Sequence, residues 1–127
     1  MNTVSKYFVS ILAAGTVLLA LPAAACDYPA RPDIPDGAAA SKDEMLAASA
    51  SVKDYLAKVD EYLTCIEDEE KAAIESMADE PNDEELRRRN DMLNKRFDAA
   101  NEEKALVGEM FNQQVRAFNE KARAARN

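Results

Sequence analysis

The sequence of 127 residues contains no histidine and no tryptophan, only three glycines and only two cysteines. Because histidine is the most common general base and transition-metal ligand, its absence removes the usual starting point for both kinds of site. Two cysteines outside a Cys-x-x-Cys pair do not make a structural zinc site, and three glycines are too few for a phosphate-binding loop. We therefore assign no catalytic, cofactor-binding or metal-ligating residue, and we expect that the protein is not an enzyme.

The chain is also poor in positive charge. Its 16 Lys and Arg stand against 24 Asp and Glu, so the net charge is −8, which argues against nucleic acid as a partner. The charge is unevenly placed, because residues 26–85 contain 18 acidic and 5 basic side chains whereas residues 86–127 contain 6 and 10. This asymmetry predicts that the two parts of the chain pair with each other.

Residues 1–25 have the three parts of a secretory signal peptide: the basic Lys6, the apolar stretch 8–21 and the small residues 23–25. We expect this segment to be cleaved, leaving a periplasmic or secreted protein with no membrane span. An uncleaved anchor is less favoured, because the apolar stretch is near the lower limit for a span. Lipoprotein anchoring through Cys26 is also less favoured, because such signals usually have leucine at position −3, where this chain has alanine.

Both cysteines, Cys26 and Cys65, belong to the mature chain. An even number of cysteines in an exported protein predicts a disulfide between them. Closing a loop of this length stabilises the folded state by about 4 kcal/mol in the chain-entropy picture. The alternatives are two free thiols, or a lipidated Cys26 with Cys65 unpaired.

Residues 26–40 contain Pro29, Pro32 and Pro35 at intervals of three, followed by Gly37. Proline fixes φ and removes a backbone donor, so this spacing predicts an extended arm that ends in a turn. A proline-rich arm can also be a ligand for an aromatic groove of another protein. An arm that lies on its own domain is favoured here, because a disulfide at its first residue would hold it there.

Two long amphipathic segments follow the arm. The first, about 41–79, begins with a capping box at Ser41–Glu44, and the second, about 83–124, begins with Asn82 as its N-cap. The sequence therefore predicts an all-α fold, in which 41–127 is an antiparallel two-helix hairpin like a coiled coil and the arm is tied to the first helix. The apolar rows behind this prediction are Met45, Val52, Val59, Ile66 and Ala73 in the first segment, and Leu86, Leu93, Ala100 and Val107 in the second, with a further row of Phe97, Phe111 and Phe118 interrupted by Asn90 and Lys104.

Chain reversal at Pro81 predicts which residues of the two segments face one another. The acidic run 67–70 lacks the alternating carboxylates of an EF-hand loop, and the arginines 87–89 point in three directions on a helix. We therefore interpret both as solvated faces with ion pairs, and not as a calcium site and an anion site. The expected neighbours are Phe97 and Ile66, Phe111 and Val52, the acidic run with Lys95 and Arg96, and the three arginines with Glu75 and Asp79.

The apolar stripe of the first segment is too wide for one partner helix. Beside the row that contains Tyr55 and Tyr62, a further row contains Leu56 and Leu63. The proline-rich arm is our first candidate for the cover of these leucines, and a second protomer or another protein is the alternative. The four residues Tyr55, Leu56, Tyr62 and Leu63 form the candidate interaction surface.

The string C-x-x-P-x-x-P-x-I-P-D-G-x-x-A that begins at Cys26 is followed by Met45, by Val52-Lys53, by Tyr55 and by Tyr62-Leu-x-Cys65. This arrangement resembles an uncharacterised family of small exported proteobacterial proteins over about residues 26–66. The resemblance implies an exported helical protein in which Cys26 and Cys65 are paired, and it implies no activity.

Three classes of function fit the sequence to different degrees. We favour a non-enzymatic exported protein that acts by protein–protein interaction, including self-association, or in an envelope-structural role. The alternative is a holdase-type periplasmic chaperone that binds clients on apolar helix faces, although the acidity of the chain argues against it. An enzyme that uses carboxylates with Tyr55 or Tyr62 is least favoured, because no acid–base pair stands out.

Overall fold

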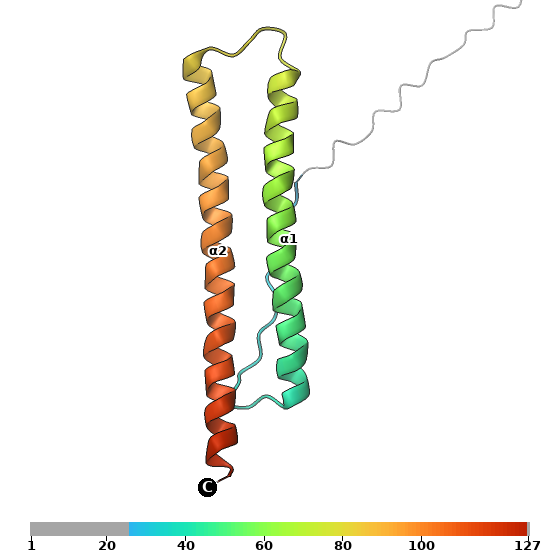
Figure 1. The fold of residues 1–127 in the computed structure, drawn as a ribbon, viewed down its shortest axis with the longest axis vertical. Coiled ribbons are helices and arrows are strands. Elements are labelled where there is room, and N and C mark those ends of the chain that lie inside the picture. The colour runs from blue at the N-terminus through green and yellow to red at the C-terminus, as the bar shows by residue number, and fades with distance from the viewer. Residues whose placement is uncertain (1–25, 127) are drawn as a thin grey trace, which may run out of the picture.

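The computed structural model describes residues 26–126 and contains two long helices, α1 (Lys42–Glu75) and α2 (Asp83–Ala124). The helices lie side by side in opposite directions and are joined by residues 76–82, so the fold is the all-α antiparallel hairpin that the sequence predicts (Figure 1). The predicted signal peptide 1–25 lies outside the described residues. In the part of the chain that the structure describes, no helix is long and apolar enough to cross a membrane.

The first turn of α1 has both hydrogen bonds of the capping box. The Ser41 hydroxyl accepts the backbone N–H of Glu44 at 3.3 Å, and the Glu44 carboxylate accepts the backbone N–H of Ser41 at 2.7 Å. These bonds satisfy two donors that have no partner within the helix. The pKa of Glu44 is lowered from its usual 4.5, mainly by the hydrogen bond from the Ser41 backbone and also by the Ser41 side chain.

Helix α1 ends at Glu75, four residues earlier than the predicted end at 79. The hydroxyl of Ser76 donates to the carbonyl of Ala73 at 2.9 Å, and the Ser76 N–H bonds to the carbonyl of Ala72, which closes the last turn. No basic residue lies in that turn, and Asp79 would bring negative charge to the negative end of the helix dipole. The earlier end is therefore the result of local side-chain bonding and unfavourable charge.

Helix α2 is longer than α1 and has favourable charges at both ends. It contains 42 residues against 34, which correspond to about 63 and 51 Å, and its C-terminal end projects beyond the start of α1 (Figure 1). The side chain of Asn82 accepts the N–H of Glu85 at 2.9 Å, as the predicted N-cap should. Acidic residues fill the first turn and basic residues the last turn, in agreement with the helix dipole.

The core is a narrow seam between the two helices. Val52 and Val59 of α1 form one cluster with Ala100 and Val107 of α2. Val59 and Val107 are completely buried, and burial of each valine contributes about 1.5–3 kcal/mol. Because a two-helix seam is open along both of its sides, each side needs a cover or remains accessible.

The arm, residues 26–40, covers one side of this seam. It has no regular secondary structure, passes behind α1 and then runs between the helices towards the C-terminal end of α2 (Figure 1). The arm contacts both helices along its length. Its anchor points are the Cys26–Cys65 disulfide, the Tyr28–Tyr55 hydrogen bond, the Arg31–Glu103 ion pair, Ile34 against the core, the hydrogen bond of Gly37 with Gln114, and the bonds from Lys121 to the carbonyls of Ala39 and Ala40.

The arm approaches α2 most closely at Gly37. Its N–H donates to the side-chain oxygen of Gln114 at 2.9 Å, while the next residues form a turn on the carbonyl of Asp36. A Cβ atom at Gly37 would overlap the backbone carbonyl of Gln114. Glycine is therefore required here by the lack of space, and this contact fixes the distance between the arm and α2.

Candidate functional site

Three tyrosines meet where the arm lies on α1. The ring of Tyr28 is edge-on to Tyr55 (centroids 6.5 Å apart, 74°) and to Tyr62 (5.0 Å, 81°). The hydroxyls of Tyr28 and Tyr55 share a hydrogen bond of 3.0 Å. Tyr55 and Tyr62 are one heptad apart and share a helix face, so one arm residue contacts both. Each edge-to-face pair contributes about 0.5–1.5 kcal/mol beyond burial.

The hydroxyl of Tyr28 is not suited to act as a base. Its pKa is raised well above the usual value, first because partial burial disfavours the phenolate and second because of the hydrogen bond with Tyr55. Tyr28 as a whole residue is 40% exposed, whereas Tyr55 is 3% exposed. The tyrosine cluster therefore holds the arm in place, and Tyr55 offers almost no surface to a partner.

A hollow of about 460 Å³ lies next to this cluster, between Tyr28, Tyr62 and Ala99. Two of the charged groups that line it, Arg96 and Glu103, already have partners within the protein. The Arg96 guanidinium lies 5.7 Å from the centroid of the Tyr62 ring and donates to the Tyr62 hydroxyl and to Glu69, each at 3.3 Å. The hydrogen bond with Tyr62 is the main reason that the pKa of Arg96 is raised. We interpret the hollow as part of the joint between the arm and the helices.

The predicted disulfide is present. Cys26 and Cys65 are bonded, with Cα atoms 5.8 Å apart, and no other cysteine occurs in the chain. The bond ties the first described residue of the arm to the middle of α1. Consequently neither thiol is free, and the disulfide is consistent with an oxidising compartment.

The arm does not cover the leucine row, and this expectation was wrong. On a helix each residue is turned by 100° from the one before it, so Leu56 and Leu63 lie on one flank of the buried row and Tyr62 and Cys65 on the other. The disulfide and Tyr28 place the arm on the tyrosine flank. Leu56 and Leu63 are half-buried and pack against the core cluster from the opposite side, which we call the open side.

The predicted ion pairs across the seam form in part. Arg96 pairs with Glu69 as expected, but Arg89 pairs with Glu70 at 3.2 Å and not with Glu75 or Asp79. Because α1 ends at Glu75, Asp79 is no longer on the helix face that was expected to meet the arginines. The Arg96–Glu69 pair is exposed and contributes tenths of a kcal/mol, whereas the Arg89–Glu70 pair is half-buried.

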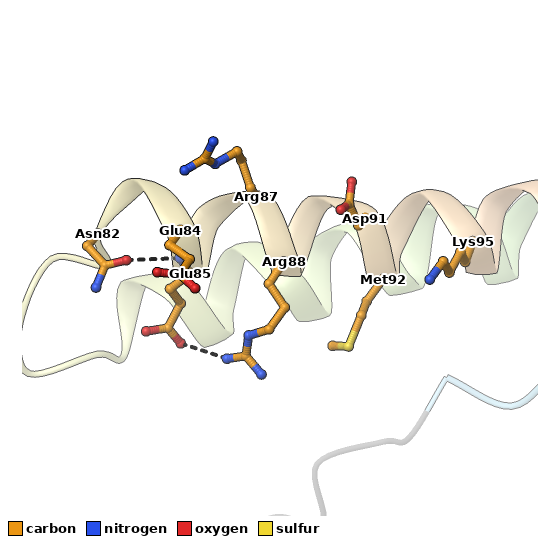
Figure 2. Close-up of a pocket in the computed structure, with 8 residues that line it drawn as sticks. All are labelled: Asn82, Glu84, Glu85, Arg87, Arg88, Asp91, Met92 and Lys95. Carbon is orange, nitrogen blue, oxygen red and sulfur yellow. Dashed lines mark hydrogen bonds and ion pairs between the residues drawn. The ribbon is translucent and has the colours of Figure 1, made fainter.

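The surface of α2 near the turn is a shallow hollow with charges of both signs (Figure 2). Arg88 pairs with Glu85 at 3.3 Å, while Arg87 extends away from this pair. Arg89 contacts the same Glu85 oxygen at 3.5 Å, and Arg87 donates to the backbone carbonyl of Asp83 at 3.2 Å. The guanidinium groups therefore already have partners within the protein and do not form a free anion site. Among the residues that the structure describes, no three or more carboxylates or cysteines are grouped so as to hold a metal ion.

Several contacts of the arm with α2 were not predicted from the sequence, among them the bonds from Lys121 to the carbonyls of Ala39 and Ala40. Arg31 pairs with Glu103, and Gly37 meets Gln114, in both cases across more than seventy residues of the chain. The string Pro-Asp-Gly indicated a turn, but nothing in it indicated the surface on which the turn rests.

Comparison with known proteins returned no family model, no curated protein and no solved structure that matches this chain. The resemblance of residues 26–66 to a family of small exported proteins therefore stays a prediction.

Proposed function

We propose that this chain is an exported, non-enzymatic protein that acts by binding another protein through the open side of its hairpin, in an interaction or envelope-structural role. The observation that carries the proposal is that the arm covers only one side of the seam between the two helices. The arm is fixed on the tyrosine flank by a disulfide and by contacts with both helices. Leu56 and Leu63 lie on the opposite flank of α1, on the open side. Half-buried leucines along a seam are the kind of surface that a partner helix covers.

Export to the periplasm or outside the cell is supported by two features. Residues 1–25 read as a signal peptide, and a disulfide persists in an oxidising compartment. The sulfur of Cys26 is bonded to Cys65 and so cannot also carry the lipid of a lipoprotein. Mass spectrometry of the exported protein under non-reducing conditions should find Cys26 as an unmodified N-terminus in an intact disulfide; a diacylglyceryl group on Cys26 would contradict this proposal.

The interaction can be tested with a pair of matched variants expressed as the whole chain. Replacement of Leu56 and Leu63 by Lys should remove the protein from larger complexes, as measured by gradient sedimentation of an extract of the exported fraction. The control places Lys at Ala57 and Thr64, one position further along and exposed, and should sediment like the unchanged protein. Circular dichroism and the intact disulfide show that each variant is folded.

If both variants sediment like the unchanged protein, the open side does not bind a partner and the proposal is wrong. If the purified protein prevents aggregation of unfolded clients and the leucine variant does not, the open side serves a chaperone and not a structural interaction. These outcomes separate the favoured function from its alternative.

A further inference from the structure

One ridge of α2 is almost free of charge. In this helix 18 of the 42 residues are charged, but of the nine residues of the ridge Lys104 alone is charged. Its ammonium group is paired with Asp60 of α1. Depletion of charge distinguishes the centre of a protein interface from ordinary surface. The ridge, which we call the open-side ridge, consists of residues spaced three or four apart: Asn90, Asn94, Phe97, Asn101, Lys104, Gly108, Phe111, Val115 and Asn119.

The open-side ridge is accessible in the hairpin. It lies on the flank of α2 away from Glu103, where the arm is attached, and on the same side of the seam as Leu56 and Leu63. Its asparagines are exposed, and its apolar residues are half-buried. A Cβ atom at Gly108 would meet nothing within 4 Å, so the middle of the ridge leaves room for another backbone to approach closely.

We propose that the open-side ridge binds a second copy of this chain, packed antiparallel across a two-fold axis near Lys104. This inference rests on the proposed function, because it names the partner of the same open side. Around that axis Phe97 of one copy lies beside Phe111 of the second, and Asn101 lies beside Gly108, so each aromatic ring meets another and the larger amide meets the glycine. In each copy the charge of Lys104 is balanced by Asp60 of the same copy.

The charges at the two ends of the hairpin select the antiparallel arrangement. Residues 75–85, at the turn, contain six acidic side chains and no basic one. Residues 116–126, at the opposite end, contain four basic side chains and one acidic. A parallel pair would bring the two acidic turns together, whereas an antiparallel pair places each acidic turn beside the basic end of the other copy.

The self-complementarity of both features favours a second copy over a different protein. The central part of the ridge, from Phe97 to Phe111, matches itself when it is reversed about Lys104, and the ends of opposite charge match under the same reversal. A two-fold interface requires this property of a single surface.

The test is sedimentation equilibrium of the oxidised protein, produced as the whole chain with export. We expect a monomer–dimer equilibrium that weakens with salt. Gly108→Lys, and independently Asn101→Lys, should raise the dissociation constant by at least about tenfold, since each places an unpaired charge within the ridge. The control Leu106→Lys adds the same charge on the opposite flank of α2, at a residue 47% exposed, and should leave the dissociation constant unchanged.

Charge reversal tests the orientation. Asp79→Lys with Glu80→Lys should weaken the dimer, and so should Arg123→Glu with Arg126→Glu, whereas all four changes in one chain should restore it. In a parallel dimer the four changes together would leave like charges facing one another and would restore nothing. A protein that is monomeric at every concentration, or equal effects of Gly108→Lys and Leu106→Lys, would overturn the proposal. If the protein is monomeric but the Leu56 and Leu63 variant still leaves its complexes in the extract, the proposed function stands with a different partner.

Discussion

Two glycines in this chain, Gly37 and Gly108, differ in the space around them. Gly37 has no room for a Cβ atom because the backbone of Gln114 occupies that space, whereas Gly108 faces open space in the middle of α2. Neither residue has a positive φ, so the difference lies in space and helix propensity and not in backbone conformation.

The same substitution should therefore have opposite effects at these two positions. Gly37→Ala should lower the free energy of unfolding by about 1–3 kcal/mol, because the arm must move away from α2. Gly108→Ala should raise it by up to about 1 kcal/mol in dilute protein, because alanine favours the helix and meets no clash. Urea unfolding followed by circular dichroism measures both. A loss of stability in Gly108→Ala at low concentration would show that its surroundings are not open.

The capping box gives a pH dependence of known sign. The pKa of Glu44 is lowered from 4.5 by hydrogen bonds from Ser41, so the folded state favours the carboxylate. Its contribution is then complete above the ordinary pKa and is lost as the pH falls below it. The difference in unfolding free energy between the unchanged protein and Glu44→Ala should shrink as the pH is lowered through 4.5. A difference that is the same at neutral and acidic pH would contradict the reciprocal bonding.

At the scale of elements, the arm covers one side of the seam, as a third helix would in a three-helix bundle. It contributes one tyrosine, one isoleucine and a set of polar contacts, but no backbone ladder that would hold it by itself. The disulfide keeps the arm at high effective concentration beside its contacts.

Loss of the disulfide should consequently weaken the whole hairpin. Replacement of Cys26 and Cys65 by Ser should lower the free energy of unfolding by about 4 kcal/mol, the loop-closure contribution for this separation. The measurement is urea unfolding of the oxidised protein and of the variant, each with and without reductant. Reductant should change only the unchanged protein. A loss below about 1 kcal/mol would mean that the arm is held by its other contacts.

The helices and the hairpin were predictable from local signals, whereas the side on which the arm lies was not. Ser41–Glu44 and Asn82 mark helix starts by chemistry that acts within four residues, and heptad spacing identifies the buried rows. The leucine row predicts an arm that covers it, but Cys65, to which the arm is bonded, lies on the other flank of the helix. A helical wheel centred on the buried row would have shown this.

The interruptions in the phenylalanine row of α2 do not by themselves indicate an interaction surface in the sequence. Asn90 and Lys104 lie on the open-side ridge, where a polar but nearly uncharged surface is continuous with Phe97 and Phe111. The end of α1 was placed too late because no proline or glycine marks it, and because serine acts as its C-cap through a local hydrogen bond.

At the scale of the whole molecule, the hairpin has two unlike sides. One is closed by the arm and fastened at Cys65, and the other presents Leu56, Leu63 and the open-side ridge. The two ends of the hairpin differ as well, because the turn is acidic and the far end of α2 is basic.

The most direct test of this two-sided account is photo-cross-linking in producing cells, with a photoreactive residue placed at Leu63 on the open side or at Lys58 on the arm side. We expect intermolecular protein adducts from position 63 and none from position 58, because Lys58, which lines a hollow together with Pro29 of the arm, lies away from the proposed binding surface. Adducts of twice the chain mass would identify the second copy, and other masses would identify a different partner. Adducts from position 58 and none from position 63 would contradict the assignment of the open side as the binding surface.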